Sequence, residues 1–251
     1  MLNRVTIGDA GRPNLLIAHG LFGSARNWGV ITKRLSDQYL VTTVDMRNHG
    51  ASPRADTQSY HDMAGDLAEV LKAVGPANVV GHSMGGKASM VLALEYPELV
   101  ERLVVADIAP VTYSHTQAHL IEFMRKIDLS KVDTRGDADR QLAEFIEEDG
   151  IGAFLLQSLD VKAKEWRLNL DVLDAQMSDI IGFPEVSGQF EKPTLFLSGA
   201  VSDYVLPEHR PAIKRLFPKA NFAKIPGAGH WLHAEKPREF EATVRAFFER
   251  T

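Results

Sequence analysis

The chain has 251 residues, no cysteine, 45% hydrophobic content and a formal net charge of −5. This length suits one α/β domain with an inserted subdomain, and the mild, dispersed charge argues against a nucleic-acid partner. The absence of cysteine excludes disulfides and thiolate metal sites. The N-terminus lacks the apolar segment of a signal peptide, and no apolar run approaches the roughly 20 residues of a membrane span. We therefore expect a soluble, cytoplasmic protein.

Short apolar runs, each bounded by Gly, Asp or Pro, predict buried strands of a parallel sheet. In chain order they cover residues 15–18, 40–44, 78–80, 103–106, 194–197 and 222–225. Helical patterns lie between them, at residues 28–35, 60–74, 84–95, 208–216 and 235–248. Strands that alternate with helices indicate right-handed crossovers, and hence an α/β fold with a mostly parallel central sheet and helices on both faces.

One stretch, residues 111–191, interrupts this alternation because it contains no convincing strand and is dominated by helical patterns. Two apolar faces are visible in it, the first formed by Leu120, Ile121, Met124 and Ile127 and the second beginning with Leu142, Phe145 and Ile146. We expect a helical lid, or cap, inserted here between two late strands. Residues 1–110 and 192–251 would then form the core domain.

The strand at residues 78–80 runs directly into Gly81-His82-Ser83-Met84-Gly85, and a helical pattern follows. In this strand–turn–helix context G-x-S-x-G is the signature of a nucleophile elbow. Glycines at both second neighbours remove side chains that would collide on such a strained turn. The turn would aim the Ser83 hydroxyl over the start of a helix, where backbone N–H groups favour developing negative charge. We predict that Ser83 is a catalytic nucleophile.

Residues 81–87 also read G-x-x-x-x-G-K, which suggests a phosphate-binding loop. That loop needs Ser or Thr next, to hold Mg²⁺, and this chain has Ala88. The elbow is therefore the better interpretation.

Acyl transfer at a serine requires hydrogen-bond donors for the oxyanion of the tetrahedral intermediate. One should be the backbone N–H of Met84, immediately after the nucleophile, and the other should come from the loop after an earlier strand. Residues 19–24, His-Gly-Leu-Phe-Gly-Ser, form that loop. We favour the N–H of Leu21 over that of Phe22. We expect His19 to be structural and to hold the loop by hydrogen bonds.

The base must be chosen among nine histidines. It should lie far downstream, in a loop after the last strand, since enzymes with this elbow order their triad as Ser, acid, His. His230 meets this requirement, because it follows the strand ending at Ile225 and precedes the C-terminal helix. His233 should cap that helix or face solvent, and His82 should point away from the nucleophile.

His115 and His119 have the i, i+4 spacing of a helical metal pair, but no third ligand is evident. We expect them on a solvated face of the lid, and we predict no metal site. The remaining histidines at positions 49, 61 and 209 have no supporting context.

With these residues placed, the chain resembles the α/β-hydrolase superfamily over nearly its whole length. More closely, it is similar to small bacterial esterases and thioesterases related to eukaryotic abhydrolase-domain proteins. The motifs that carry the resemblance are His19–Ser24, Asp45–Gly50, Gly81–Lys87, Asp107–Pro110, Glu165–Asn169 and Gly229–Trp231. The resemblance implies the α/β-hydrolase fold, a small-molecule ester or acyl-CoA thioester substrate, and no cofactor. We expect the Asp45–Gly50 turn to be structural, because its polar side chains can tie adjacent loops together.

Two residues compete to be the acid that orients His230. Asp203 follows the strand at 194–197, where members of the superfamily usually place it, and Asp107 ends the preceding strand. Asp203 lies one residue later after its glycine than the usual spacing, and in the closer family the aspartate of Asp107-Ile108-Ala109-Pro110 is thought to serve. We favour Asp107, with Asp203 or Ser202 supporting or sharing the role.

The leading hypothesis is an esterase or thioesterase that works through an acyl-enzyme on Ser83. Carbon–carbon bond hydrolases and cofactor-free haloperoxidases share the triad, and a ligand receptor of the same fold can retain it without turnover. We expect the lid to set acyl-chain preference, because its apolar faces must cover the catalytic end of the sheet or remain exposed. Trp166 and Phe123 are candidate pocket walls, with lid core as the alternative.

Overall fold

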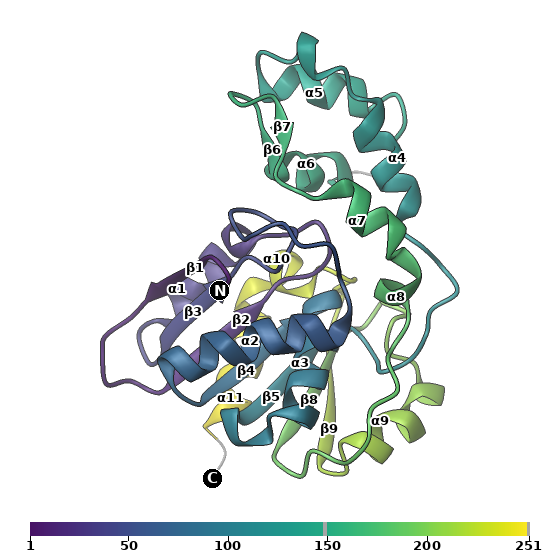
Figure 1. Ribbon diagram of the computed structural model, residues 1–251. Coiled ribbons are helices and arrows are strands. Elements are labelled where there is room, and N and C mark those ends of the chain that lie inside the picture. Colours follow the sequence, from purple (N-terminus) through teal and green to yellow (C-terminus); the bar gives the residue numbers. More distant parts are fainter. Residues whose placement is uncertain (148–149, 250–251) are drawn as a thin grey trace.

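A computed structural model describes residues 1–147 and 150–249 of the chain. Its centre is a seven-stranded sheet with the strand order β1-β3-β2-β4-β5-β8-β9 (Figure 1). The strands are β1 (Arg4–Ile7), β2 (Asn14–Ala18), β3 (Leu40–Val44), β4 (Ala77–His82), β5 (Val100–Ala106), β8 (Thr194–Gly199) and β9 (Ala220–Ile225). β1 pairs antiparallel with β3, and all the other neighbours are parallel.

All six predicted strands are present, and β1 is an additional strand that the sequence did not reveal. Three of the four β1 residues are exposed and the fourth is half-buried, so this edge strand has no apolar run to mark it. The predicted sheet with helices on both faces is confirmed.

Helices cover both faces of this sheet. They are α1 (Gly29–Leu35), α2 (Tyr60–Val74), α3 (Met84–Glu95), α9 (Arg210–Leu216), α10 (Leu232–Glu235) and α11 (Pro237–Phe248), with 3-10 turns at Ala25–Trp28, Pro97–Leu99 and Pro207–His209. α2 and α3 lie side by side on one face, and α1 and α11 lie on the other. The predicted helix at 235–248 corresponds to α11, which begins two residues later, because Lys236 has non-helical φ and ψ of −133° and 61° and separates α11 from the short α10.

The strands explain why the sheet carries two cores. Successive side chains of a strand point to opposite faces, so Val79 and Val105 join the core under α2 and α3. Val80 and Val104, one residue along, join the core under α1 and α11. A strand that is buried on both faces therefore needs apolar residues at consecutive positions, which gives a continuous apolar run in the sequence.

The chain between β5 and β8 forms a separate group of elements, seen in teal and green in Figure 1. They are α4 (Ala118–Lys126), a 3-10 turn (Leu129–Lys131), α5 (Arg135–Leu142), α6 (Ile151–Leu155), a second 3-10 turn (Leu156–Ser158), β6 (Leu159–Asp160), β7 (Glu165–Trp166), α7 (Leu170–Ala175) and α8 (Met177–Ile181). No helix within the described ranges is long and apolar enough to cross a membrane.

The first predicted apolar face of this segment is confirmed, since Leu120, Ile121 and Met124 are buried on α4. Two other details differ from the sequence prediction. The second predicted apolar face does not extend along one helix, because α5 ends at Leu142. The strands β6 and β7 pair as a hairpin of two residues each, which is too short to produce a visible alternation in the sequence.

Candidate active site

Ser83 occupies a sharp turn between β4 and α3, with φ of 52° and ψ of −121°. A non-glycine residue in such a conformation costs about 1–3 kcal/mol and must be held there by its surroundings. A Cβ on Gly81 would lie 2.4 Å from the carbonyl oxygen of Gly85. A Cβ on Gly85 would lie 2.4 Å from the carbonyl oxygen of His19. The turn therefore requires glycine on both sides of the serine, as the motif predicts.

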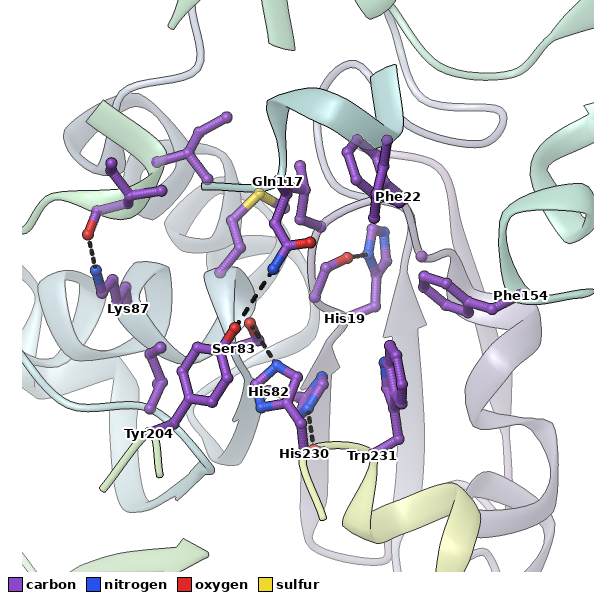
Figure 2. A pocket seen from close by; sticks show the side chains of 18 of the residues that line it. His19, Phe22, His82, Ser83, Lys87, Gln117, Phe154, Tyr204, His230 and Trp231 are labelled. Atoms are coloured by element: carbon purple, nitrogen blue, oxygen red, sulfur yellow. Dashed lines mark hydrogen bonds between the residues drawn. The ribbon is translucent and has the colours of Figure 1, made fainter. Parts of the chain in front are cut away.

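His230 lies in the loop after β9, and its ring faces Ser83 (Figure 2). The distance from His230 Nε2 to Ser83 Oγ is 3.1 Å, within hydrogen-bonding range. On the other side of the ring, Nδ1 lies 2.8 Å from Oδ2 of Asp107, which is fully buried at the end of β5. The structure thus brings together three residues that come from three separate loops.

The Asp107 carboxylate is held by two further donors besides His230. The backbone N–H of Gly199 donates to Oδ1 at 3.0 Å, and the Ser202 hydroxyl donates to Oδ2. Asp203 has an exposed side chain, and among the described residues no hydrogen bond or ion pair joins it to His230. Among the described residues Ser202 has no hydrogen bond to His230 either, so it is linked to the imidazole only through Asp107.

A tyrosine that the sequence did not reveal packs against His230. The ring of Tyr204 stacks on the imidazole, with 4.0 Å between centroids and 21° between planes. Tyr113 fixes this ring, because its hydroxyl donates to the Tyr204 carbonyl at 2.7 Å and accepts the Ala109 N–H at 2.9 Å. The only sequence signal for Tyr204 is its position directly after Asp203, the other candidate acid.

Two other histidines pack behind the base. His82 Nε2 donates to the backbone carbonyl of His230 at 2.9 Å and not to Ser83, as predicted. The prediction for His233 is wrong: it neither caps a helix nor faces solvent, but stacks on buried Trp28 with 4.0 Å between centroids. The reason is that α10 begins at Leu232 and turns the next side chain into the core. Burial lowers the pKa of His233 to about 3.

His115 and His119 do not share a helix face, because α4 begins only at Ala118. Both are exposed, at one side of the cavity described below. Within residues 1–147 and 150–249, no group of three or more His, Cys, Asp or Glu side chains is placed to hold a metal ion.

Lys87 lies one turn after Ser83 on α3 and is fully buried. Its ammonium group donates to the carbonyl oxygens of Val111, Ile181 and Gly182, and Figure 2 shows one of these hydrogen bonds. Burial lowers its pKa to about 7. These carbonyls lie where the chain leaves the core after β5 and where it comes back, so Lys87 joins both connections to α3. Its ammonium is not directed at a phosphate position, which agrees with the rejection of a phosphate loop.

The loop after β2 makes a tight turn, in which the Gly23 N–H donates to the Gly20 carbonyl at 3.0 Å. Phe22 has φ of 62°, and its own N–H donates to a histidine of the neighbouring loop. In contrast, no acceptor among the described residues contacts the N–H of Leu21. Met84 is the first residue of α3, and the first N–H groups of a helix have no intrahelical acceptor. The two predicted oxyanion donors, the N–H groups of Leu21 and Met84, therefore have no hydrogen-bond acceptor among the described residues.

The Ser83 hydroxyl opens into a cavity of about 410 Å³. Its apolar walls are formed by Leu21, Phe22, Ile108, Leu120, Ile151, Phe154, Ile180, Ile181 and Trp231. Phe154 and Trp231 approach each other at its edge, with 5.8 Å between ring centroids (Figure 2).

Neither of the two candidate pocket walls reaches this cavity. Trp166 is buried and donates its indole N–H to the Met124 carbonyl at 3.1 Å, and Phe123 stacks on Phe145. Both belong to the core of the 111–191 segment, which was the alternative interpretation.

Comparisons with known proteins agree with this geometry. The mouse (Mus musculus) sn-1-specific diacylglycerol lipase ABHD11 is 43% identical, over 96% of this chain and 82% of its own length. Esterase YbfF of Escherichia coli (strain K12) is 39% identical, over 92% of this chain and 90% of its own. The solved structure of a marine microorganism esterase is 38% identical and superposes with a TM-score of 0.93 over 98% of both chains. A sequence model of the alpha/beta hydrolase family matches residues 15–243. The chain therefore belongs to the alpha/beta hydrolase family.

Proposed function

We propose that this chain cleaves its ester substrate through an acyl-enzyme formed on Ser83. The chain is a carboxylic ester hydrolase, and the proposal concerns its mechanism and substrate class. The observation that carries it is the hydrogen-bonded series Asp107–His230–Ser83, which opens directly into an apolar cavity. This series has the geometry of a nucleophile, a base and an orienting acid.

In the first half-reaction, Ser83 Oγ attacks the ester carbonyl carbon while His230 Nε2 removes its proton. Asp107 holds the Nδ1–H, so the imidazole has the correct tautomer and its cation is stabilised. The N–H groups of Leu21 and Met84 donate to the oxyanion, and each such donor is worth roughly 100-fold or more in rate. The carbon–oxygen bond then breaks, and His230 gives its proton to the leaving alkoxide.

In the second half-reaction, a water molecule takes the place of the alcohol. His230 removes its proton as it attacks the acyl carbon, the bond to Ser83 Oγ breaks, and the serine recovers its proton. No redox step or external group is needed. Thioesters such as acyl-CoA follow the same course, since a thiolate leaves in place of the alkoxide.

The cavity favours an acyl group with an apolar chain, because its walls are mostly aliphatic and aromatic. None of the described residues that line it is Asp or Glu, so a neutral or anionic ester is not repelled. The related diacylglycerol lipase suggests that glycerol esters belong among the substrates to test.

Residues 111–191 act as a lid in this proposal, over a core of residues 1–110 and 192–251. Part of the apolar cavity wall comes from five residues of this segment: Leu120, Ile151, Phe154, Ile180 and Ile181. Lys87 joins both of its connections to the nucleophile helix. The lid is thus fastened beside the nucleophile.

The test is a turnover survey of p-nitrophenyl esters from acetyl to dodecanoyl, alongside the matching acyl-CoA thioesters. Ser83→Ala should fold normally and lose more than 100-fold in kcat, because the attacking atom is gone. Ser187→Ala, which changes an exposed serine, is the matched control and should keep full activity. An acyl adduct on Ser83 should be detected by mass spectrometry. If Ser83→Ala retained more than about one-hundredth of wild-type kcat, Ser83 would not be the nucleophile.

The survey separates the alternative functions once a fluorophosphonate probe and the substrates of carbon–carbon bond hydrolases and haloperoxidases are added to it. A ligand receptor would be labelled by a fluorophosphonate but would show no multiple turnover on any ester. A carbon–carbon bond hydrolase or a haloperoxidase would turn over its own substrates faster than every ester in the series.

A further inference from the structure

Two buried histidines that take no part in the Asp107–His230–Ser83 series face each other beneath the predicted oxyanion loop. His19 begins the loop after β2, and His49 lies in the loop after β3. Each side chain is only 1% exposed, and their ring centroids are 5.2 Å apart at an interplanar angle of 61°. The pair therefore joins the two loops at a point that solvent does not reach.

Each histidine accepts a backbone N–H from the loop of the other. Met46, in the second loop, donates its N–H to His19 Nε2 at 2.9 Å. Phe22, in the first loop, donates its N–H to His49 Nε2 at 3.2 Å. The two contacts are reciprocal, so neither loop can shift without breaking a bond that the other provides.

The second nitrogen of each ring fixes the tautomer. His19 Nδ1 lies 2.7 Å from the Gly20 carbonyl oxygen, and His49 Nδ1 lies 2.8 Å from the Arg47 carbonyl oxygen. Because both Nε2 atoms accept hydrogen bonds, the proton of each neutral ring is on Nδ1 and donates to these carbonyls. Burial keeps both rings neutral: it lowers the pKa of His19, and it lowers that of His49 to about 3.

These bonds hold the two peptide groups on either side of Leu21. The Gly20 carbonyl receives the His19 Nδ1–H and the Gly23 N–H, and a trans peptide points its N–H opposite to its carbonyl. The Leu21 N–H is therefore turned away from His19. Gly20 itself lies against the nucleophile, since a Cβ built on it would be 3.1 Å from Ser83 Cβ.

The next peptide is held by His49. The bond between Gly20 and Gly23 closes a tight turn, and a positive φ at the third residue alone makes it a type II turn. The Phe22 N–H is the amide of the central peptide of this turn. A flip of that peptide would place the Leu21 carbonyl against the lone pair of His49 Nε2. A neutral His49 therefore selects one orientation of the turn.

We propose that His19 and His49 form a brace that positions the Leu21 N–H as an oxyanion donor. The inference rests on the proposed function, because only a tetrahedral intermediate on Ser83 needs that donor. His49 is a positioning residue: it touches neither the reacting atoms nor Ser83, and it acts through the Phe22 peptide. Because the Phe22 N–H already donates to His49, the N–H of Leu21 is the one that is free to donate to an oxyanion.

His49→Leu and His49→Gln test the brace. Leucine fills the space without an acceptor, whereas the glutamine amide oxygen can replace Nε2. We expect His49→Leu to lose at least tenfold in kcat with KM changed less than threefold, because the oxyanion exists only in the transition state. Its affinity for a trifluoromethyl ketone with the same acyl chain should weaken in proportion. His49→Gln should recover most of both losses.

A folded His49→Leu protein with kcat and ketone affinity within twofold of wild type would overturn the proposal. So would equal losses in the leucine and glutamine variants. If His49→Leu fails to fold, NMR of the unaltered protein decides: the Leu21 amide proton should move downfield when the trifluoromethyl ketone forms its adduct, and the Phe22 amide should not. The reverse pattern would overturn the brace. Failure of the wild-type protein to form any adduct would overturn the proposed function and the brace together, and only that outcome affects both.

Discussion

Asp107 Oδ2 lies 2.8 Å from His230 Nδ1, so the imidazole is paired with the aspartate that follows β5 and not with Asp203, which follows β8. The two strands are parallel neighbours, and their loops open at the same end of the sheet. Topology alone therefore permits either acid. The two aspartates differ in their burial: the side chain of Asp107 is fully buried, whereas that of Asp203 is exposed.

Asp107→Asn should lower kcat by about 10³- to 10⁴-fold with little change in KM, because an amide holds the wrong imidazole tautomer. Asp203→Asn, the matched control, should stay within about threefold of wild type. Steady-state kinetics on one ester measures both variants and the double mutant. Inactivation by Asp203→Asn with a nearly silent Asp107→Asn would reverse the assignment. Comparable partial losses with a far larger loss in the double mutant would mean that two acids serve His230.

Much of the fold could be predicted because local and global requirements agree in the sheet. The apolar runs predict the buried strands, and Tyr60–Val74 and Met84–Glu95 begin and end as helices where the sequence indicates. Ser83 could be located for the same reason, since a strained turn allows only glycine at Gly81 and Gly85. For these strands and helices and for the Ser83 turn, the local sequence pattern is compatible with only one local structure.

The remaining features depend on contacts between segments far apart in the sequence. His233 is buried because Trp28, about 200 residues earlier, provides a ring to stack on. His49 has no local sequence signal, because its partner is the backbone N–H of Phe22 in another loop. The choice of Asp107 over Asp203 depended on family resemblance, because each aspartate follows a strand of the same sheet.

Ser158→Ala should weaken both stability and catalysis. The Ser158 hydroxyl is buried in the 111–191 segment and donates at 2.9 Å to the carbonyl of Phe22, in the predicted oxyanion loop. Removing it leaves a buried carbonyl unpaired, which costs about 1–3 kcal/mol. We expect a lower free energy of unfolding in urea and a several-fold lower kcat. Ser187→Ala, which is exposed, should change stability by less than about 0.5 kcal/mol. Normal kcat in a destabilised Ser158→Ala protein would show that this bond is purely structural.

Acid should destabilise the protein through its buried histidines. The pKa of His233 is about 3 in the folded protein, against an ordinary value of about 6.5 in the unfolded chain. Between these values only the unfolded chain binds the proton, so the free energy of unfolding falls as the pH falls from 6.5 toward 3. One such histidine contributes about 1.4 kcal/mol per pH unit.

His233→Phe should remove this contribution, since phenylalanine retains a ring to stack on Trp28 and does not titrate. Urea denaturation at pH 6.5, 5.5 and 4.5 should give a shallower slope for the variant than for wild type. Between pH 7.5 and 8.5 the difference between the two proteins should stay constant. Parallel slopes from pH 6.5 to 4.5 would contradict the low pKa of His233.

We expect acyl-chain selectivity to depend on the side chains of residues 111–191 that face the cavity. Ile151 and Phe154 are both half-buried on α6 and line the cavity near Trp231. Ile151→Trp should shorten the space for the acyl chain, and Phe154→Ala should lengthen it. Each methylene that fits or is excluded is worth about 1–3 kcal/mol, or 10- to 200-fold in kcat/KM.

The measured quantity is the ratio of kcat/KM for octanoyl and acetyl p-nitrophenyl esters. It should fall by at least tenfold in Ile151→Trp and rise in Phe154→Ala, while kcat for the acetyl ester stays near wild type because the reacting atoms are untouched. Phe123→Leu is the control, since Phe123 stacks on Phe145 away from the cavity and its change should leave the ratio as it is. If neither cavity variant shifts the ratio more than this control does, residues 111–191 cover the site without choosing its substrate.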